Sequence, residues 1–185
     1  MTRLSTAARV AHDLGLAAWF GGTLFGKIAF NPSVRVIGSK PERGKLGGTS
    51  WNRFNTLNTA SFIVAGVTWL SGRFGFSGRG MDRRTRNLVL AKDALMGVAG
   101  CVGLAVLILQ IVLYRQAPEG SVPLETGGVP AAEASDRASR LQRTVSALGS
   151  VHIALFAGLV ALTTMLSAQT GQSSRRQSVL SRQGR

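Results

Sequence analysis

Apolar positions along this chain gather into four long stretches, and most charged positions lie between them. The stretches cover residues 7–30, 54–70, 94–114 and 145–166. A helix that crosses a hydrocarbon layer about 30 Å thick needs about 20 residues, within a range of about 17–25. Each stretch falls in or near that range, so the pattern predicts an all-α protein, a bundle of four transmembrane helices.

The third and fourth stretches carry the clearest signal. Gln110 is the only strongly polar side chain in the third, and His152 is the only ionisable one in the fourth. A soluble amphipathic helix would show a charged face, with charged positions every three or four residues, and the third stretch has no such face. The pattern therefore favours membrane spans over the alternative, a soluble bundle of unusually apolar helices. The second stretch is the shortest and most polar of the four.

The first stretch has an alternative interpretation as a cleaved signal peptide, because Arg3 and Arg9 come before most of its apolar residues. The stretch is long, however, contains His12, Asp13 and Lys27, and lacks a convincing small-x-small cleavage site. We therefore expect a retained helix. The four spans form one domain over residues 1–168, and residues 169–185, rich in Gln, Ser and Arg, are expected to be a disordered basic tail.

The net charge of +14 follows from 22 Lys and Arg against 8 Asp and Glu. Basic residues at the ends of membrane helices hold their orientation and attract anionic lipid headgroups, so the loops and tail are predicted to contact lipids. No helix-turn-helix, zinc finger or basic stripe with interleaved aromatic residues is present, and we expect no nucleic-acid partner.

With four spans, both termini lie on one side. The N-terminal segment, second loop and tail hold eleven Lys and Arg, and the first and third loops hold nine. The excess favours cytoplasmic termini. The third loop, residues 115–142, contains Pro118, Pro123, Pro130 and several glycines. This composition predicts an exposed, partly flexible connection, a spacer rather than a lid over a ligand.

Glycines recur at helical spacing within the spans. Small residues mark the faces along which membrane helices pack closely. They include a GxxxG pair in the first span and a series in the third: Gly22, Gly26, Gly97, Gly100 and Gly103. Packing within the bundle is the simpler expectation, and the alternative is an interface that builds a homo-oligomer or a larger membrane complex.

Four ionisable residues enter the spans at similar depth on one side of the predicted bilayer: His12, Asp13, Lys92 and Asp93. Ionisable groups inside a membrane are costly and often functional. We expect a structural role, such as an ion pair between Asp13 and Lys92, or side chains that reach back to water. A proton or ion pathway is the alternative.

Paired histidines in a four-helix membrane protein also raise the possibility of haem. His12 lies about six residues before the middle of its span and His152 about three before the middle of its own, and the two helices run antiparallel. At 1.5 Å per residue, the two imidazoles are about 13 Å apart along the bundle axis. Ligands to one haem iron need nearly equal depth, so the sequence predicts no haem, and it holds no CxxCH attachment motif.

Polar amides follow one another at three-residue spacing at the start of the second span: Asn52, Asn55 and Asn58. Because an amide facing lipid would lack hydrogen-bond partners, all three are expected to face the bundle. There they either bond to neighbouring helices or line a small polar cavity.

The segment AHDLGLAAWFGGTLFG, residues 11–26, resembles the start of copper-resistance-D-type membrane proteins, with the match carried by His12, Trp19, Gly21 and Gly22. It is also similar to small, functionally uncharacterised four-helix membrane proteins of high-GC Gram-positive bacteria. The resemblance covers about one helix. It implies a cytoplasmic-membrane bundle and allows a copper or haem connection, although the chain has no Met-rich or His-rich cluster.

No nucleophile–base pair, carboxylate pair or metal-ligand cluster stands out, and the single cysteine, Cys101, lies within the third span. We therefore expect neither an enzyme nor a bound metal or cofactor. The sequence favours a small accessory or structural membrane component. A transport or ion-handling protein that uses the intramembrane ionisable residues is the second hypothesis, and a haem- or copper-linked protein is the third.

Overall fold

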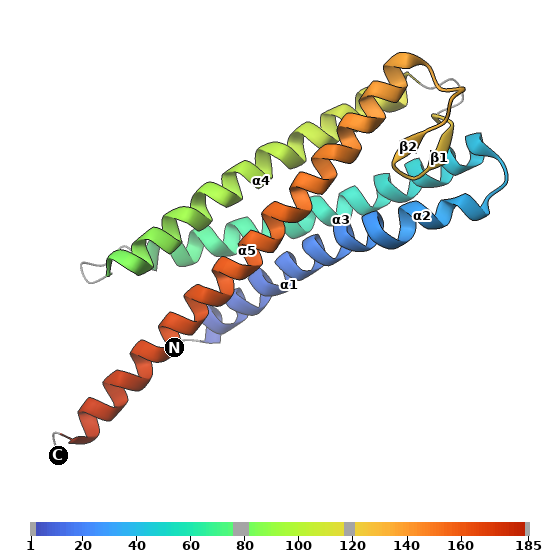
Figure 1. The fold of residues 1–185 in the computed structure, drawn as a ribbon. Coiled ribbons are helices and arrows are strands. Elements are labelled where there is room, and N and C mark those ends of the chain that lie inside the picture. The colour runs from blue at the N-terminus through green and yellow to red at the C-terminus, as the bar shows by residue number, and fades with distance from the viewer. Residues whose placement is uncertain (1–2, 76–81, 117–120, 184–185) are drawn as a thin grey trace.

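The computed structural model describes residues 3–75, 82–116 and 121–183, and it is all-α apart from one small β-hairpin (Figure 1). Four long helices dominate: α1 (Arg3–Phe25), α3 (Lys40–Gly75), α4 (Arg83–Arg115) and α5 (Asp136–Gln183). Short helical turns extend α1, namely η1 (Gly26–Phe30), α2 (Asn31–Ser33) and η2 (Val34–Val36), and the hairpin pairs β1 (Leu124–Thr126) with β2 (Val129–Pro130).

Three of the long helices begin at a polar side chain that caps the free N–H groups of the first turn. The Asp82 carboxylate accepts a bond from the backbone N–H of Thr85 at 3.2 Å, and hydrogen bonds with Thr85 lower the pKa of Asp82. The hydroxyl of Ser135 accepts from the N–H of Ala138 at 3.3 Å at the start of α5, and Ser39 accepts from Glu42 at the start of α3.

The helices alternate in direction along the bundle, so the two termini, the end of α3 and the start of α4 lie at one end (Figure 1). The hairpin and the turns that follow α1 lie at the other. α1 packs mainly against α3, and α4 packs mainly against α5, with further contact between α1 and α5. The buried core at the middle of the bundle joins all four helices through Trp19, Ala65, Ala99, Phe156 and Leu159.

Each predicted span lies within one long helix or its direct continuation, and the helices are longer than the predicted spans. Two of them, α4 over Arg83–Arg115 and α5 over Asp136–Gln169, are long and apolar enough to cross a membrane. The basic residues expected in a first loop, from Lys40 to Arg53, instead lie in the first turns of α3. α5 remains helical to Gln183, where the sequence predicts disorder from Gln169, because the segment contains no proline and extends a helix that is already formed.

The connection between α4 and α5 is not the flexible spacer that its composition predicts. Val122, Leu124 and Ala131 are buried, and the hairpin packs against α3 and the turns after α1. The N–H of Gly127 donates to the carbonyl of Asn31 at 2.9 Å. Glycine and proline serve here to form a tight, closely packed turn. Pro118 lies outside the described residues.

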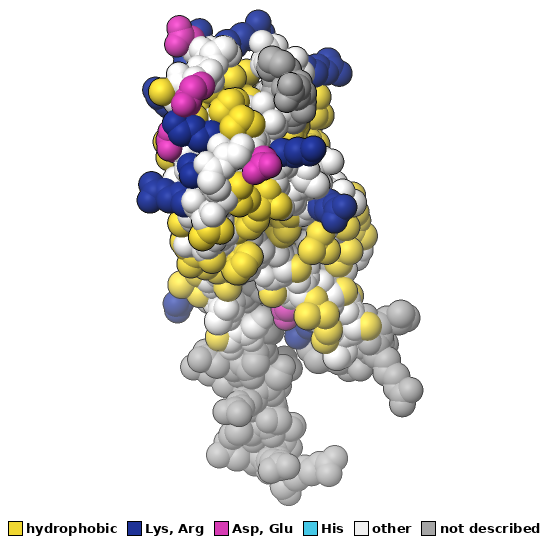
Figure 2. Space-filling model, turned by 90° about the vertical axis from the view of Figure 1, so that its right-hand side faces the viewer, with side chains coloured by type: hydrophobic (Ala, Val, Ile, Leu, Met, Phe, Trp, Pro, Cys, Tyr) yellow, Lys and Arg dark blue, Asp and Glu magenta, His cyan; other side chains and the backbone are white. Residues whose placement is uncertain are grey.

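Ion pairs attach the hairpin to the start of α3. The Lys40 ammonium lies 2.6 Å from a Glu125 carboxylate oxygen and 2.9 Å from one of Glu133. The Arg43 guanidinium donates to the backbone carbonyls of Ile37 and Glu125. The bonds from Lys40 to Glu125 and Glu133 raise the pKa of Lys40, and the bond from Lys40 lowers the pKa of Glu133. On the face seen in Figure 2, charged side chains gather at this end of the molecule.

Four of the five predicted packing glycines face the interior of the bundle. Gly22 and Gly26 lie against the rings of Phe54 and Trp51, and a Cβ at either position would overlap the ring. Gly100 lies against Phe62 and Gly103 against His152, whereas a Cβ at Gly97 would meet no atom within 4 Å. The close approach of α1 to α3 therefore depends on the GxxxG pair.

Candidate functional site

Two polar regions occupy the interior of the bundle, and the first is a buried pair near the termini. Lys92 is 1% exposed, and its Nζ lies 2.8 Å from Nε2 of His12. Nδ1 of His12 lies 2.8 Å from the carbonyl oxygen of Ala65, which can only accept, so Nδ1 carries a proton. In the neutral ring Nε2 is then an acceptor, and the Lys92 ammonium donates to it.

An aromatic ring and an ion pair complete this region. The ammonium of Lys92 lies over the Trp69 ring, 4.1 Å from its centroid, in cation–π geometry. The indole N–H of Trp69 donates to Asp93 at 2.7 Å, and the other Asp93 oxygen accepts from Arg73 at 3.0 Å. The negative charge of Asp93 is thus held by an arginine at the end of α3 rather than by its sequence neighbour Lys92.

The structure brings together three of the four ionisable residues predicted for this end of the bundle. His12, Lys92 and Asp93 converge on Trp69, while Asp13 is exposed on the outer side of α1. The predicted ion pair between Asp13 and Lys92 is not among the ion pairs of the described residues, and His12 takes its place. Successive residues on a helix point about 100° apart, and in α1 this rotation turns His12 inward and Asp13 outward.

His152 lies at a different level of the bundle. Its Nε2 donates to the carbonyl of Ala99 at 3.0 Å, and its ring packs against both Trp19 and Phe156, which also contact each other. Lys92 and Ala99, the α4 partners of the two histidines, are separated by seven residues, or about 10 Å along the helix. The two imidazoles therefore do not face each other across one metal ion.

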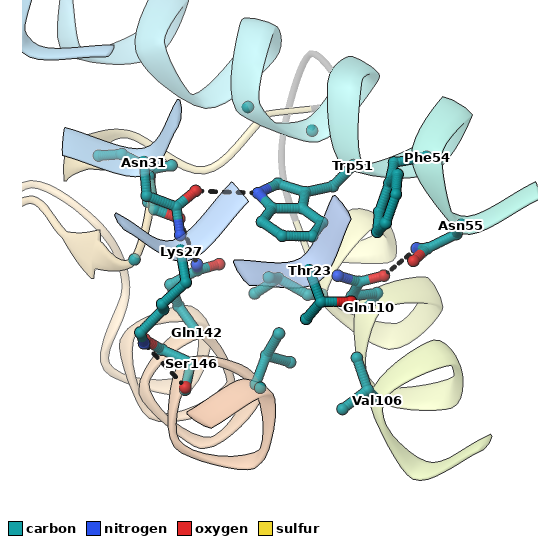
Figure 3. A pocket seen from close by; sticks show the side chains of 18 of the residues that line it. Thr23, Lys27, Asn31, Trp51, Phe54, Asn55, Val106, Gln110, Gln142 and Ser146 are labelled. Atoms are coloured by element: carbon teal, nitrogen blue, oxygen red, sulfur yellow. Dashed lines mark hydrogen bonds between the residues drawn. The ribbon is translucent and has the colours of Figure 1, made fainter. Parts of the chain in front are cut away.

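The second polar region is a cavity of about 110 Å³ near the hairpin end, to which α1, α3, α4 and α5 all contribute (Figure 3). Val122, Leu124, Gly127 and Gly128 from the hairpin segment line it, and so does His152. Its polar walls carry hydroxyls, amides, an indole and one ammonium: Thr23, Lys27, Asn31, Trp51, Asn55, Asn58, Gln110, Tyr114, Gln142 and Ser146.

A π-helical turn, η1, shapes the cavity wall where α1 ends. π-helical turns occur frequently at functional sites. Lys27 lies within this turn, and Asn31 follows it directly. The Lys27 ammonium donates to Oγ of Ser146 at 2.9 Å and to its carbonyl at 3.1 Å, and the Trp51 indole donates to Oδ1 of Asn31 at 3.0 Å (Figure 3).

Two of the three predicted amides line this cavity. Asn55 donates to the side-chain oxygen of Gln110, a bond that joins α3 to α4 (Figure 3). Asn58 also lines the cavity, and its buried Oδ1 has no hydrogen-bond partner among the described residues. Asn52 is exposed and does not line it. Both expected roles of the amides, helix bridging and cavity lining, thus occur in one place.

Sequence reasoning did not select Lys27, Trp51, Gln142 or Ser146 as site residues. A signal for Lys27 was nonetheless present. His12, Leu16, Trp19 and Thr23 are buried at spacings of three and four, and Lys27 continues this series by four more residues. Gln142 and Ser146 are also four apart, but nothing in the sequence connects them with α1.

Comparisons with protein-family models, with curated proteins and with solved structures find no match to this chain. Among the described residues, no group of three or more His, Cys, Asp or Glu side chains is arranged to hold a metal ion. The two polar regions and the surface of the bundle are therefore the features that bear on function.

Proposed function

We propose that this chain is a multi-pass integral membrane protein whose four helices cross the bilayer, and that it serves as a small, non-enzymatic membrane component. One observation carries the proposal. The bundle is apolar on the outside and polar at several points inside, which is the reverse of a soluble helical bundle.

The outer surface supports this proposal on all four helices. Large apolar side chains that are at least one third exposed occur in every predicted span: Val10, Leu14, Phe25, Ile28, Leu57, Ile63, Val64, Val67, Leu70, Val98, Leu104, Ile108, Ile111, Val151, Val160 and Met165. No Lys, Arg, Asp or Glu occurs in residues 54–70, 94–114 or 145–166. A soluble protein rarely leaves so continuous an apolar surface in water, whereas lipid chains would cover it.

The interior supports it as well. His12, Thr23, Ser61, Lys92 and His152 are all less than 9% exposed. Polar side chains in membrane bundles face one another rather than lipid, and there they join helices that gain little from hydrophobic association.

For orientation, we propose cytoplasmic termini and an outward-facing hairpin, with basic residues at both ends in contact with anionic headgroups. The larger number of Lys and Arg at the end that holds the termini supports this orientation. Any homo-oligomer, or any contact with a larger complex, would use outward positions such as Gly97.

Cysteine labelling tests the proposal. Cys101 is exposed and lies near the middle of the third span. In membrane vesicles, a water-soluble maleimide should leave Cys101 unlabelled until SDS is added. In a Cys101→Ser background, Asn87→Cys should react from the side of the termini and Val36→Cys from the opposite side. Rapid labelling of native Cys101 would show that water reaches this surface and would contradict the membrane proposal.

A second candidate, ion handling, is favoured by the buried Lys92. In proteoliposomes that hold a pH-sensitive dye, a proton pathway predicts that Lys92→Met abolishes flux. Asp13→Asn should not affect it, since Asp13 lies outside the bundle. Equal flux through Lys92→Met and wild type would exclude a pathway through this pair and leave the accessory role.

A further inference from the structure

The cavity near the hairpin end has one charged group in its wall. Among its described lining residues, Lys27 is the only ionised side chain, and none is Asp or Glu. The four ion pairs of the described residues involve Lys40, Arg43 and Arg73, but not Lys27. The cavity therefore carries a positive charge that no carboxylate in its wall balances.

The contacts of Lys27 are to neutral acceptors on a single residue. An ammonium has three N–H donors, and the two hydrogen bonds of Lys27 both go to Ser146. A cation in a partly enclosed site is stabilised by a negative partner much more than by a hydroxyl, since water screens its charge poorly there. The site thus favours a ligand that brings negatively charged oxygens to Lys27.

The rest of the wall fits a small organic or inorganic acid. Trp51, Phe54 and Tyr114 supply aromatic surface, while Gln142 and Thr23 supply neutral polar groups. Gly149 of the wall leaves space that a side chain would fill, because a Cβ there would meet no atom within 4 Å. A volume of about 110 Å³ exceeds many times the roughly 10–15 Å³ that one water needs.

We propose that this cavity is a binding site for a small anion, a carboxylate or phosphate group whose negative charge lies on Lys27. The π-helical turn at Gly26–Phe30 places Lys27 at the cavity wall, and the hairpin shields the bound group from bulk water. Such a group can come from a free acid in solution or from the headgroup of an anionic lipid.

Thermal unfolding of the full chain in a neutral detergent tests the proposal, with inorganic phosphate, succinate and dispersed phosphatidylglycerol as separate probes. We expect at least one probe to raise the melting temperature saturably. Phosphate or succinate would identify a free acid as the source, and phosphatidylglycerol alone, with phosphatidylcholine inactive, would identify a lipid headgroup. If none of the probes stabilises the wild type, the proposal is wrong.

Matched variants separate the site from general charge effects. Lys27→Met should raise the Kd at least about tenfold, because a charge-assisted hydrogen bond is lost. Lys45→Met removes the same charge from an exposed position of α3 and should bind as the wild type does. An equal response of the two variants would overturn the assignment to Lys27.

A third variant keeps the test decisive if Lys27→Met does not fold. Gly149 lines the cavity, and a Cβ there would meet no atom within 4 Å. Gly149→Leu should therefore fold with Lys27 intact while it fills the space for the ligand, and its melting temperature should no longer respond to the anion. A full response of folded Gly149→Leu would show that the anion binds elsewhere.

Discussion

Gly26 faces the indole ring of Trp51 so closely that no Cβ fits between them. This contact, and the equivalent one between Gly22 and Phe54, brings α1 against α3 beside the cavity. It also means that the GxxxG pair is occupied within one chain, which leaves other surfaces for any association between copies.

Gly22→Ala should lower the stability of the bundle. The added methyl group must displace the Phe54 ring, and overpacking of this kind costs about 1–3 kcal/mol. Gly21→Ala is the matched control, because a Cβ at this neighbouring position meets no atom within 4 Å. Thermal unfolding in detergent compares the two. Equal melting temperatures would contradict the packing described for α1 and α3. If the wild type has the mass of a dimer in detergent and Gly22→Ala alone has the mass of a monomer, Gly22 lies at an interface between two copies of the chain.

His12 and Lys92 should be energetically coupled. His12→Leu leaves a buried ammonium without its acceptor, and Lys92→Met leaves a buried imidazole nitrogen without its donor. Each single variant should be destabilised, and the double variant by less than their sum, with a coupling energy of about 0.5–3 kcal/mol. Unfolding of all four proteins measures it. Additive effects would show that the two side chains do not interact.

The attachment of the hairpin to α3 should depend on pH. Glu133, whose pKa is lowered by its bond from Lys40, stabilises the attachment above its ordinary pKa of 4.5, and this contribution is lost as the pH falls through the lowered value. Lys40, whose pKa is raised, stabilises it below 10.5, and its contribution is lost as the pH rises through the raised value. The attachment should therefore be firmest between these limits.

A spin label reports this change. Val129 is 51% exposed on the hairpin, so Val129→Cys in a Cys101→Ser background can be labelled without disturbing the core. Label mobility should rise as the pH falls well below 4.5, while Val122 and Leu124 keep the hairpin in place. The additional changes Glu125→Gln and Glu133→Gln should give the mobile spectrum already at neutral pH. A spectrum that stays constant in acid would argue that the ion pairs do not hold the hairpin.

Loss of the bond between Asn55 and Gln110 should weaken the contact between α3 and α4 in the half of the bundle that holds the cavity. Gln110→Leu leaves the half-buried Asn55 amide without its acceptor, at a cost of up to about 1–3 kcal/mol. Asn52→Leu removes a similar amide from an exposed position of α3 and is the control. Thermal unfolding measures both. Similar stability of the two variants would contradict a bridging role for Asn55.

Much of the fold could be predicted from the hydrophobic pattern, since predominantly apolar stretches of 17 or more residues favour helices over strands. The four helices of the all-α prediction are present, and α4 and α5 are long and apolar enough to cross a membrane. Rotation about each helix axis was harder to predict. His12 and Asp13 are adjacent and both ionisable, so neither residue alone shows which of them faces inward. Only the helical spacing of His12 with the apolar residues Leu16 and Trp19 indicates that His12 lies on the buried face.

The hairpin could not be predicted from composition. Glycine and proline occur both in flexible connections and in tight turns, and partners far along the chain decide between these outcomes. Here Asn31 and Arg43 bond to the hairpin backbone over 80 or more residues of sequence. The cavity was missed for the same reason, since its walls come from four separate helices.

The position of the hairpin has a consequence for biosynthesis. Lys40 and Arg43 leave the ribosome long before Glu125 and Glu133, and the wall residues Gln142 and Ser146 follow later still. A nascent chain with its first three helices in place thus carries unpaired cations at one end and an open chamber beside them. Glu125 and Glu133 balance that charge once the hairpin packs against α3, and the chamber is complete only when Gln142 and Ser146 at the start of α5 join it. Two successive steps of folding, the hairpin first and α5 after it, are therefore needed before this end of the bundle takes its final form.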